Sequence, residues 1–148
     1  MLAQHCRGFL IALLSLLLAA CGPTQTPEAQ VRSVIAAGEA AAEARDLSAL
    51  MELVATDFRD DQVGGREELQ QYLRGYLVMH QSIHLLTRIE SIDFPYSDMA
   101  RVHVTVGSLA SETGDSTSFD LAADVQELDL QLVREGEHWR VRRASRSQ

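Results

Sequence analysis

The residues best suited to moving a proton lie in the middle of the chain. Tyr72, Tyr76 and His80 recur at intervals of four residues, which places them on one face of a helix. A base held beside a hydroxyl donor can take a proton from carbon while the donor stabilises the oxygen anion that forms. In such chemistry Asp61 or His80 is the candidate base, and Tyr72 or Tyr76 is the candidate donor.

Each of these side chains also has a purely structural interpretation. Tyr72 and Tyr76 share their helix face with Leu69 and Leu73, as core aromatic residues do. His80 falls near the end of the helix, where the helix dipole favours an imidazolium without any catalytic task. Both interpretations therefore stay open for Tyr72, Tyr76 and His80, which we call the aromatic stripe.

Polar residues outside the stripe have the same two interpretations. Asp60 and Asp61 fit a turn that leads to Gly64 and Gly65. His103 belongs to the polar half of an alternating strand, so we expect it to face solvent or a partner.

Metal and cofactor sites are not indicated. His80 and His84 have the spacing of a helical metal-binding pair, but the strand period begins between them, and no H-E-x-x-H pattern occurs. The chain contains no phosphate-loop or dinucleotide-binding glycine pattern, and it contains no lysine, which excludes Schiff-base catalysis. We therefore predict neither a metal nor a cofactor.

The charge balance is acidic, with 13 basic residues against 21 acidic ones and a net charge of −8. This argues against general nucleic-acid binding and against broad adsorption to an anionic membrane. One local basic cluster departs from this balance, and it comprises Arg140, Arg142, Arg143 and Arg146. It has two interpretations, a charged strand that resists aggregation or a contact with an anionic envelope partner.

The amino terminus reads as an export signal. Arg7 precedes an apolar run over residues 8–18, which is too short to span a membrane comfortably. The sequence "LAAC" at residues 18–21 resembles the signal of bacterial lipoproteins, in which the cysteine receives a diacylglyceryl group and becomes the new, acylated amino terminus. The alternative is an ordinary cleavage that leaves Cys21 as a free thiol.

The lipoprotein resemblance divides the chain into a signal peptide (1–20), a lipidated tether (21–26) and a single domain (27–148). Two or more acyl chains at Cys21 would anchor the domain stably to a membrane. Because Gly22 replaces the aspartate of inner-membrane retention signals, we expect a periplasm-facing location at the outer membrane. The other cysteine, Cys6, lies in the removed segment, so no intrachain disulfide is expected.

The first half of the domain predicts helices. Thr26 followed by Pro27 is typical of a helix start, and Asp46 predicts a second start whose apolar face continues to Phe58. After a turn over residues 59–65, a third helix carries the stripe from Leu69 to His80.

The second half of the domain predicts strands, because the apolar period changes to two from Ile83. Strands are expected over residues 83–94, 100–106 and 119–132 and from Trp139 onward. In the segment 119–132 the alternation changes phase, so a β-bulge near Gln126 and Glu127 would keep one face buried. The result is an α+β fold, with three amino-terminal helices packed on a strongly bent antiparallel sheet whose cone-shaped interior can hold a pocket.

The order of three segments resembles the nuclear transport factor 2-like superfamily, which includes polyketide cyclases, ketosteroid isomerase and scytalone dehydratase. The segments are "GEAAAEARDLSALMELVATDFRDD" (38–61), "GGREELQQYL" (64–73) and "REGEHWRVRRAS" (134–145). The resemblance covers residues 27–145 and implies a helix, an Asp-Leu helix restart and an acidic strand within the first segment.

The catalytic members of this superfamily place an acid or a histidine inside the cone, beside a tyrosine or a second acid. The resemblance therefore implies an acidic rim and a set of pocket candidates. The rim candidates are Asp57, Asp60 and Asp61, and the pocket candidates are Asp57, Tyr72, Tyr76, His80, His84 and Trp139.

Three functions fit these observations. The first is a non-catalytic, envelope-anchored domain that binds a small apolar ligand or a protein partner, favoured because no acid, histidine and tyrosine set matches one catalytic family. The second is a lyase or isomerase with an Asp or His base, and the third is a homodimeric module that associates through its open sheet face.

Overall fold

The computed structural model describes residues 25–112 and 121–147. The expected signal peptide and Cys21 lie outside the described residues, as do the first two residues of the strand expected over 119–132. Within the described ranges, no helix is long and apolar enough to cross a membrane.

Two helices begin at the residues that the sequence indicates. Helix α2 (Pro27–Glu43) is capped by Thr26, whose hydroxyl accepts a hydrogen bond from the amide of Ala29 at 3.2 Å. Helix α3 (Leu47–Glu52) is capped in the same way by Asp46, with an N–O distance of 3.0 Å.

The expected helical face that continues to Phe58 is wrong, because the chain leaves α3 after Glu52 and forms strand β1 (Val54–Asp60). This strand is the acidic strand that the resemblance implies at the end of the segment 38–61, so that expectation is confirmed. Val54 and Phe58 are both buried, so the apolar pattern was real but its period was misassigned. Strand β2 (Gly64–Gly65) then pairs antiparallel with the end of β1. The layout is therefore not helices first and strands afterwards.

Helix α4 (Arg66–Met79) is followed without a loop by strand β3 (His80–Tyr96). His80 is the carboxyl-terminal cap of the helix and has extended backbone angles, so the strand begins three residues earlier than the sequence indicates. The helix end and the strand start are thus one continuous corner of the fold.

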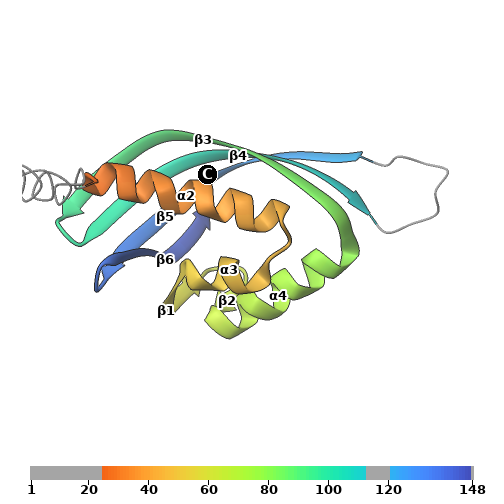
Figure 1. The fold of residues 1–148 in the computed structure, drawn as a ribbon, viewed down its shortest axis with the longest axis horizontal. Helices are drawn as coiled ribbons and strands as arrows, with labels where there is room; N and C mark the ends of the chain where they lie inside the picture. Colours follow the sequence, from red (N-terminus) through yellow and green to blue (C-terminus); the bar gives the residue numbers. More distant parts are fainter. Residues whose placement is uncertain (1–24, 113–120, 148) are drawn as a thin grey trace, which may run out of the picture.

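The strands form one six-stranded sheet in the order β2-β1-β6-β5-β4-β3. The remaining strands are β4 (Met99–Glu112), β5 (Leu121–Glu135) and β6 (His138–Arg146). All neighbouring pairs are antiparallel except β1 and β6, which run parallel. The long strands β3 and β4 arch over α2, so the sheet is strongly bent and α2 lies in its concave side (Figure 1).

The expected bulge near Gln126 and Glu127 is wrong. The pairing of β4 with β5 is continuous from Met99 opposite Val133 to Ser111 opposite Leu121. Because the phase never changes, Val125 points away from the core and is 70% exposed. Where β5 pairs with β6 the irregularity lies in β6, where Arg142 is the extra residue between the partners of Gln131 and Leu132. Strand β3 also shifts its register against β4, at three places along its length.

The core lies between α2 and the inner face of the sheet. Its buried residues are Val31, Ala100, Val102, Leu132 and Trp139. The indole N–H of Trp139 donates to the side-chain oxygen of Gln30 at 3.0 Å, which satisfies the one polar atom of that ring. A smaller cluster of Met51, Val54 and Phe58 packs α3 and β1 against α4.

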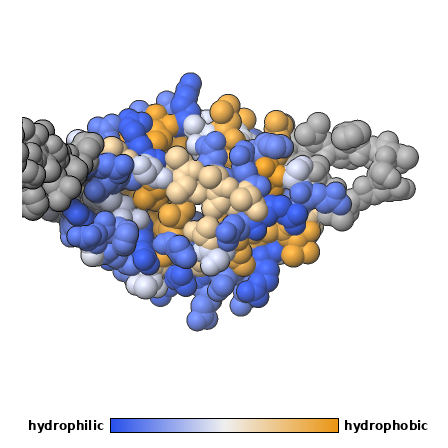
Figure 2. Space-filling view, in the orientation of Figure 1, coloured by the Kyte–Doolittle hydropathy of each residue, from blue (hydrophilic) through white to orange (hydrophobic). Residues whose placement is uncertain are grey.

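Helix α2 also covers the edge of the sheet at β3. Glu43 accepts a hydrogen bond from the backbone amide of Leu85 at 3.0 Å, and Glu39 accepts one from the hydroxyl of Thr87. The first of these contacts satisfies one backbone amide of the edge strand. From the α2 side, hydrophilic residues surround a pale apolar patch over the middle of the helix, where Ala36, Ala37 and Ala40 are exposed (Figure 2).

Candidate functional site

A cavity of about 540 Å³ lies between α4 and the inner face of the sheet, at the end remote from Trp139. We call it the tyrosine cavity. Most of its wall is aliphatic, with a few polar groups that converge on it. It is lined by Ala42, Leu50, Tyr72, Leu73, Tyr76, Leu77, His80, Ile83, Leu85, Val106, Ser108, Asp124, Gln126 and Leu128. Such a lining suits a mostly apolar molecule with one or two polar groups.

The helical stripe that the sequence indicates forms one wall of this cavity. The rings of Tyr72 and Tyr76 lie 6.4 Å apart, and the rings of Tyr76 and His80 stack at 4.0 Å. Tyr72 is 56% exposed and lies toward the opening, whereas Tyr76 and His80 are half-buried. The stripe therefore brings two hydroxyl groups and an imidazole to one site.

Tyr76 is held in its protonated form. Its pKa is raised above the ordinary value of 10.0, first by burial and then by the nearby charges of Tyr72 and Asp124. A phenol with a raised pKa keeps its proton throughout the neutral range. Tyr76 is therefore a hydrogen-bond donor, not an anion, at neutral pH.

His80 is oriented by the helix that it terminates. Its Nδ1 lies 2.8 Å from the backbone carbonyl oxygen of Tyr76. A carbonyl can only accept, so Nδ1 carries the proton in this contact. In the neutral ring the lone pair then resides on Nε2, which is the arrangement required of a base.

Three polar residues of the cavity were missed by the sequence analysis: Ser108, Asp124 and Gln126. The hydroxyl of Ser108 donates to the carbonyl oxygen of Asp124 at 3.5 Å, and the amide of Gln126 donates to its carboxylate. The expected bulge had obscured Asp124 and Gln126, because it assigned the alternate residues of this segment to the inner face. If the strand is assumed to alternate without a bulge up to the buried Leu132, Asp124 and Gln126 fall on the inner face.

Arg45 braces the corner that carries His80. Its guanidinium donates to the carbonyl oxygens of Leu77 at 2.5 Å and Gln81 at 3.4 Å, across the junction of α4 and β3. Arg45 itself has a positive φ of 57°, a conformation that costs a non-glycine residue free energy. The strained backbone conformation therefore occurs at the residue whose side chain holds the end of α4 in place.

The three acidic residues expected at the rim, Asp57, Asp60 and Asp61, do not line the tyrosine cavity. Asp57 is exposed and forms an ion pair with Arg142 at 2.9 Å. One carboxylate oxygen of Asp60 accepts hydrogen bonds from the backbone amides of Gln62 and Val63, as is typical of a turn. The side chain of Asp61 is 71% exposed and lines a neighbouring hollow, so it does not converge with Tyr76 and His80.

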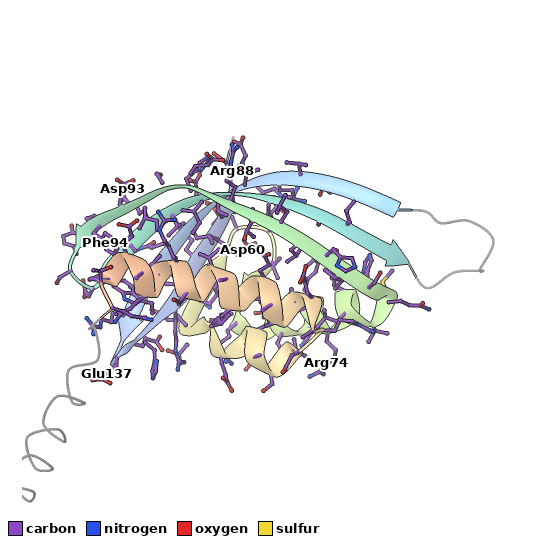
Figure 3. All side chains as sticks on the ribbon, turned by 45° about the horizontal axis from the view of Figure 1, so that its top comes forward. Asp60, Arg74, Arg88, Asp93, Phe94 and Glu137 are labelled. Carbon is purple, nitrogen blue, oxygen red and sulfur yellow. The ribbon has the colours of Figure 1, made fainter. Side chains whose placement is uncertain are left out.

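The other two pocket candidates also lie outside this cavity. The side chain of His84 is 72% exposed and approaches Glu43 at 3.9 Å. Trp139 is only 3% exposed and packs in the core, edge-on to Phe94 with ring centroids 5.9 Å apart. Phe94 lies near the amino-terminal end of α2 (Figure 3), far along the sheet from α4.

Most of the basic cluster is neutralised within the chain. Three of the four arginines lie close to carboxylates of their own domain, and Arg146 lines the same hollow as Asp61. The pairs are Arg140–Glu135 at 3.5 Å, Arg142–Asp57 at 2.9 Å and Arg143–Asp61 at 3.9 Å. These contacts favour the interpretation of the cluster as a charged strand, since its guanidinium groups already have counter-ions.

His103 lies on the outer face of the sheet, from which Arg88 and Asp93 also project away from α2 (Figure 3). Its Nδ1 lies 2.9 Å from the carboxylate of Asp129 on the neighbouring strand. This hydrogen bond is the largest cause of a pKa raised above the ordinary 6.5, opposed by partial desolvation and aided by the charges of Asp129, Glu127 and Glu90. No group of three histidine, cysteine or acidic side chains in the described part of the chain could hold a metal ion.

Comparison with known proteins places the fold but not the activity. No family model matches the sequence, and no curated protein matches it. A ketosteroid isomerase-like protein from Erwinia carotovora atroseptica superimposes with a TM-score of 0.64 at 13% identity, covering 81% of this chain and 95% of the other.

Two further structures agree with this result. A Streptomyces avermitilis protein of the NTF2-like family gives a TM-score of 0.65 at 18% identity, with 80% of this chain and 95% of that one covered. A type 2 hexachlorocyclohexane dehydrochlorinase gives 0.67 at 12% identity, with 81% and 83% covered. At these identities the likeness establishes architecture alone: the chain has the α+β, cone-forming fold of nuclear transport factor 2-like proteins.

Proposed function

We propose that the domain is an enzyme of the lyase or isomerase type, which removes a proton from carbon next to a carbonyl group in a small, mostly apolar molecule. The observation that carries the proposal is the convergence of His80, Tyr76 and Tyr72 on one largely aliphatic cavity. Structural neighbours that are named as a dehydrochlorinase and as ketosteroid isomerase-like lend support at the level of fold.

In this proposal His80 is the general base. Its Nδ1–H is engaged by the carbonyl of Tyr76, so Nε2 is the nitrogen that takes the proton from the substrate carbon. The electron pair of the broken C–H bond moves into a carbon–carbon double bond, and the carbonyl oxygen becomes an enolate. Tyr76, and Tyr72 at the opening, donate hydrogen bonds to that oxygen.

The type of reaction then depends on where the imidazolium returns the proton. If the proton goes to a different carbon, the reaction is an isomerisation. If the enolate instead expels a leaving group from the adjacent carbon, with the proton following the leaving group, the reaction is an elimination. The aliphatic wall places apolar surface beside the reacting part of the molecule in either case.

The test is exchange of carbon-bound hydrogen, which does not require the natural substrate. The chain is incubated in D2O with a panel of cyclic ketones, and loss of the proton signal next to the carbonyl is followed by NMR. We expect catalysed exchange with at least one ketone, reduced about 100-fold by His80→Gln and about 10-fold or more by Tyr76→Phe.

His84→Gln is the matched control, because that imidazole is exposed and lies outside the cavity. It should leave the exchange rate unchanged. Equal rates in the wild type and His80→Gln would refute the assignment of the base. Ketones that bind without any exchange would instead favour the non-catalytic ligand-binding function.

We further propose that this domain works outside the cytoplasm, anchored by acyl chains on Cys21 at the periplasmic side of the outer membrane. The support is the leader sequence, with its short apolar run and the box before the cysteine. Substrates in that location are molecules that reach the cell envelope, since nucleotide cofactors are not available there.

A further inference from the structure

The hairpin between β3 and β4 ends in exposed apolar side chains. Phe94 and Tyr96 are among the last residues of β3, and they are 38% and 66% exposed. Pro95, which lies between them, is also exposed. We call residues 94–96 the hairpin tip. Single exposed apolar residues are ordinary, but three consecutive ones at the end of a hairpin form a patch of the kind that marks an interaction surface.

The hairpin tip lies at the end of the domain where α2 begins (Figures 1 and 3). The ring of Phe94 packs edge-on against Trp139, with centroids 5.9 Å apart. The indole of Trp139 in turn donates to Gln30 in the first turn of α2 at 3.0 Å. A buried tryptophan therefore joins the hairpin tip to the start of the helix.

The proposed lipid anchor is close in sequence to this same end. Cys21 comes five residues before Thr26, which caps α2. Five residues span at most about 18 Å, because a fully extended chain advances about 3.5 Å per residue. Acyl chains on Cys21 would therefore keep the start of α2 near the bilayer, with the hairpin tip beside it.

The charges around the hairpin tip indicate which kind of membrane surface suits it. Asp93 and Asp98 flank the tip and are exposed, and Arg101 lies opposite Asp93 on β4. The tip thus lacks the excess of basic residues that an anionic leaflet attracts. A tyrosine ring, apolar with one polar hydroxyl, suits the headgroup layer without any help from charge. A zwitterionic phospholipid surface is therefore the partner that fits.

We propose that the hairpin tip inserts into the headgroup layer of the membrane that holds the anchor, with zwitterionic phospholipid as its partner. This inference rests on the proposed anchor at Cys21 and goes beyond it, since an anchor alone leaves the domain free to turn. The tether makes the contact intramolecular, so two aromatic side chains that bind a membrane weakly by themselves are sufficient. The tyrosine cavity, remote from Trp139, then faces away from the membrane.

The test is hydroxyl-radical labelling, which oxidises side chains exposed to water and locates them by peptide mass spectrometry. The full chain is expressed with its leader in a bacterium, purified from the membrane and reconstituted in phosphatidylcholine vesicles. The Cys21→Ser chain in solution is the reference. We expect the oxidation of Tyr96 relative to Tyr72 to fall about fivefold on the vesicles, because a tethered contact is occupied most of the time. Tyr72 is the internal control, since it is 56% exposed and lines the remote cavity.

Two variants locate the contact. Tyr96→Ser should return the oxidation of Phe94 on vesicles to its level in solution. Val125→Ser is the matched control, since Val125 is 70% exposed and lies near the opposite end of β5 from the hairpins. It should leave the protection of Phe94 and Tyr96 unchanged. High salt should also leave this protection unchanged, because screening acts on charges.

Equal oxidation of Tyr96 on vesicles and in solution would overturn the inference, and co-sedimentation of the chain with the vesicles would show that the anchor still stands. Protection on phosphatidylglycerol vesicles but not on phosphatidylcholine vesicles would overturn the assigned partner. An amino-terminal peptide without acyl mass would refute the anchor instead. Coupling Cys21 to a maleimide lipid in the Cys6→Ser chain then supplies the tether, and the same comparison decides the inference.

Discussion

The phase of strand β5 decides which residues reach the cavity, and two substitutions on that strand test it. Leu132 lies on the inner face and is 0% exposed, whereas Val125 lies on the outer face and is 70% exposed. Leu132→Ala removes three carbons, which at about 0.8 kcal/mol each is about 2.4 kcal/mol, and the space left behind raises the cost to about 3 kcal/mol. Val125→Thr should change the free energy of unfolding by less than about 0.5 kcal/mol.

The assay is urea unfolding followed by the fluorescence of Trp139, the single tryptophan of the chain. At a slope of about 2 kcal/mol per molar urea, Leu132→Ala should lower the midpoint by about 1.5 M without changing the slope. A cost of about 1.5 kcal/mol or more for Val125→Thr would place that side chain in the core. The strand would then be bulged after all, and Asp124 and Gln126 would not line the cavity.

Two further predictions concern the outer face and the amino terminus. Asp129→Asn should bring the pKa of His103 down toward its ordinary value, as measured by NMR titration of the ring. Because the pKa of His103 is raised in the folded state, its contact with Asp129 stabilises the fold fully below about pH 6.5, and this stabilisation is lost as the pH rises through the folded-state pKa. A difference in unfolding free energy between wild type and variant that is the same at every pH would contradict this. Cys21→Ser should move the chain from the membrane fraction to the soluble fraction and remove the added lipid mass from its amino-terminal peptide, whereas Cys6→Ser should do neither.

The local patterns of the sequence identified most elements but not their assembly. Thr26 and Asp46 indicated both helix starts correctly, because a side-chain oxygen that caps exposed backbone amides acts within three residues. The segment from Val54 to Phe58 was misassigned, since five residues with buried ends fit a helix or a strand equally well. Its parallel pairing with β6 joins parts of the chain that no local pattern connects.

The same division applies to the candidate site. The spacing of Tyr72, Tyr76 and His80 alone placed them on one face, because helical periodicity is a local property. Asp61 and His84 have suitable side chains but point elsewhere, and nothing in their immediate neighbours reveals this. Asp124 joins the site only through the register of β5 against β4.

The sequence by itself determined the acidic charge, and its local patterns indicated the helix caps and the aromatic stripe of α4, since each of these two depends on residues within one or two turns of each other. Only the tertiary structure decided which stripe faces a cavity and which acid reaches it. The physical reason is that burial and Coulomb interaction depend on distance in space. Where a helix packs into a bent sheet, residues such as Tyr76 and Asp124 become neighbours although they are far apart in the sequence.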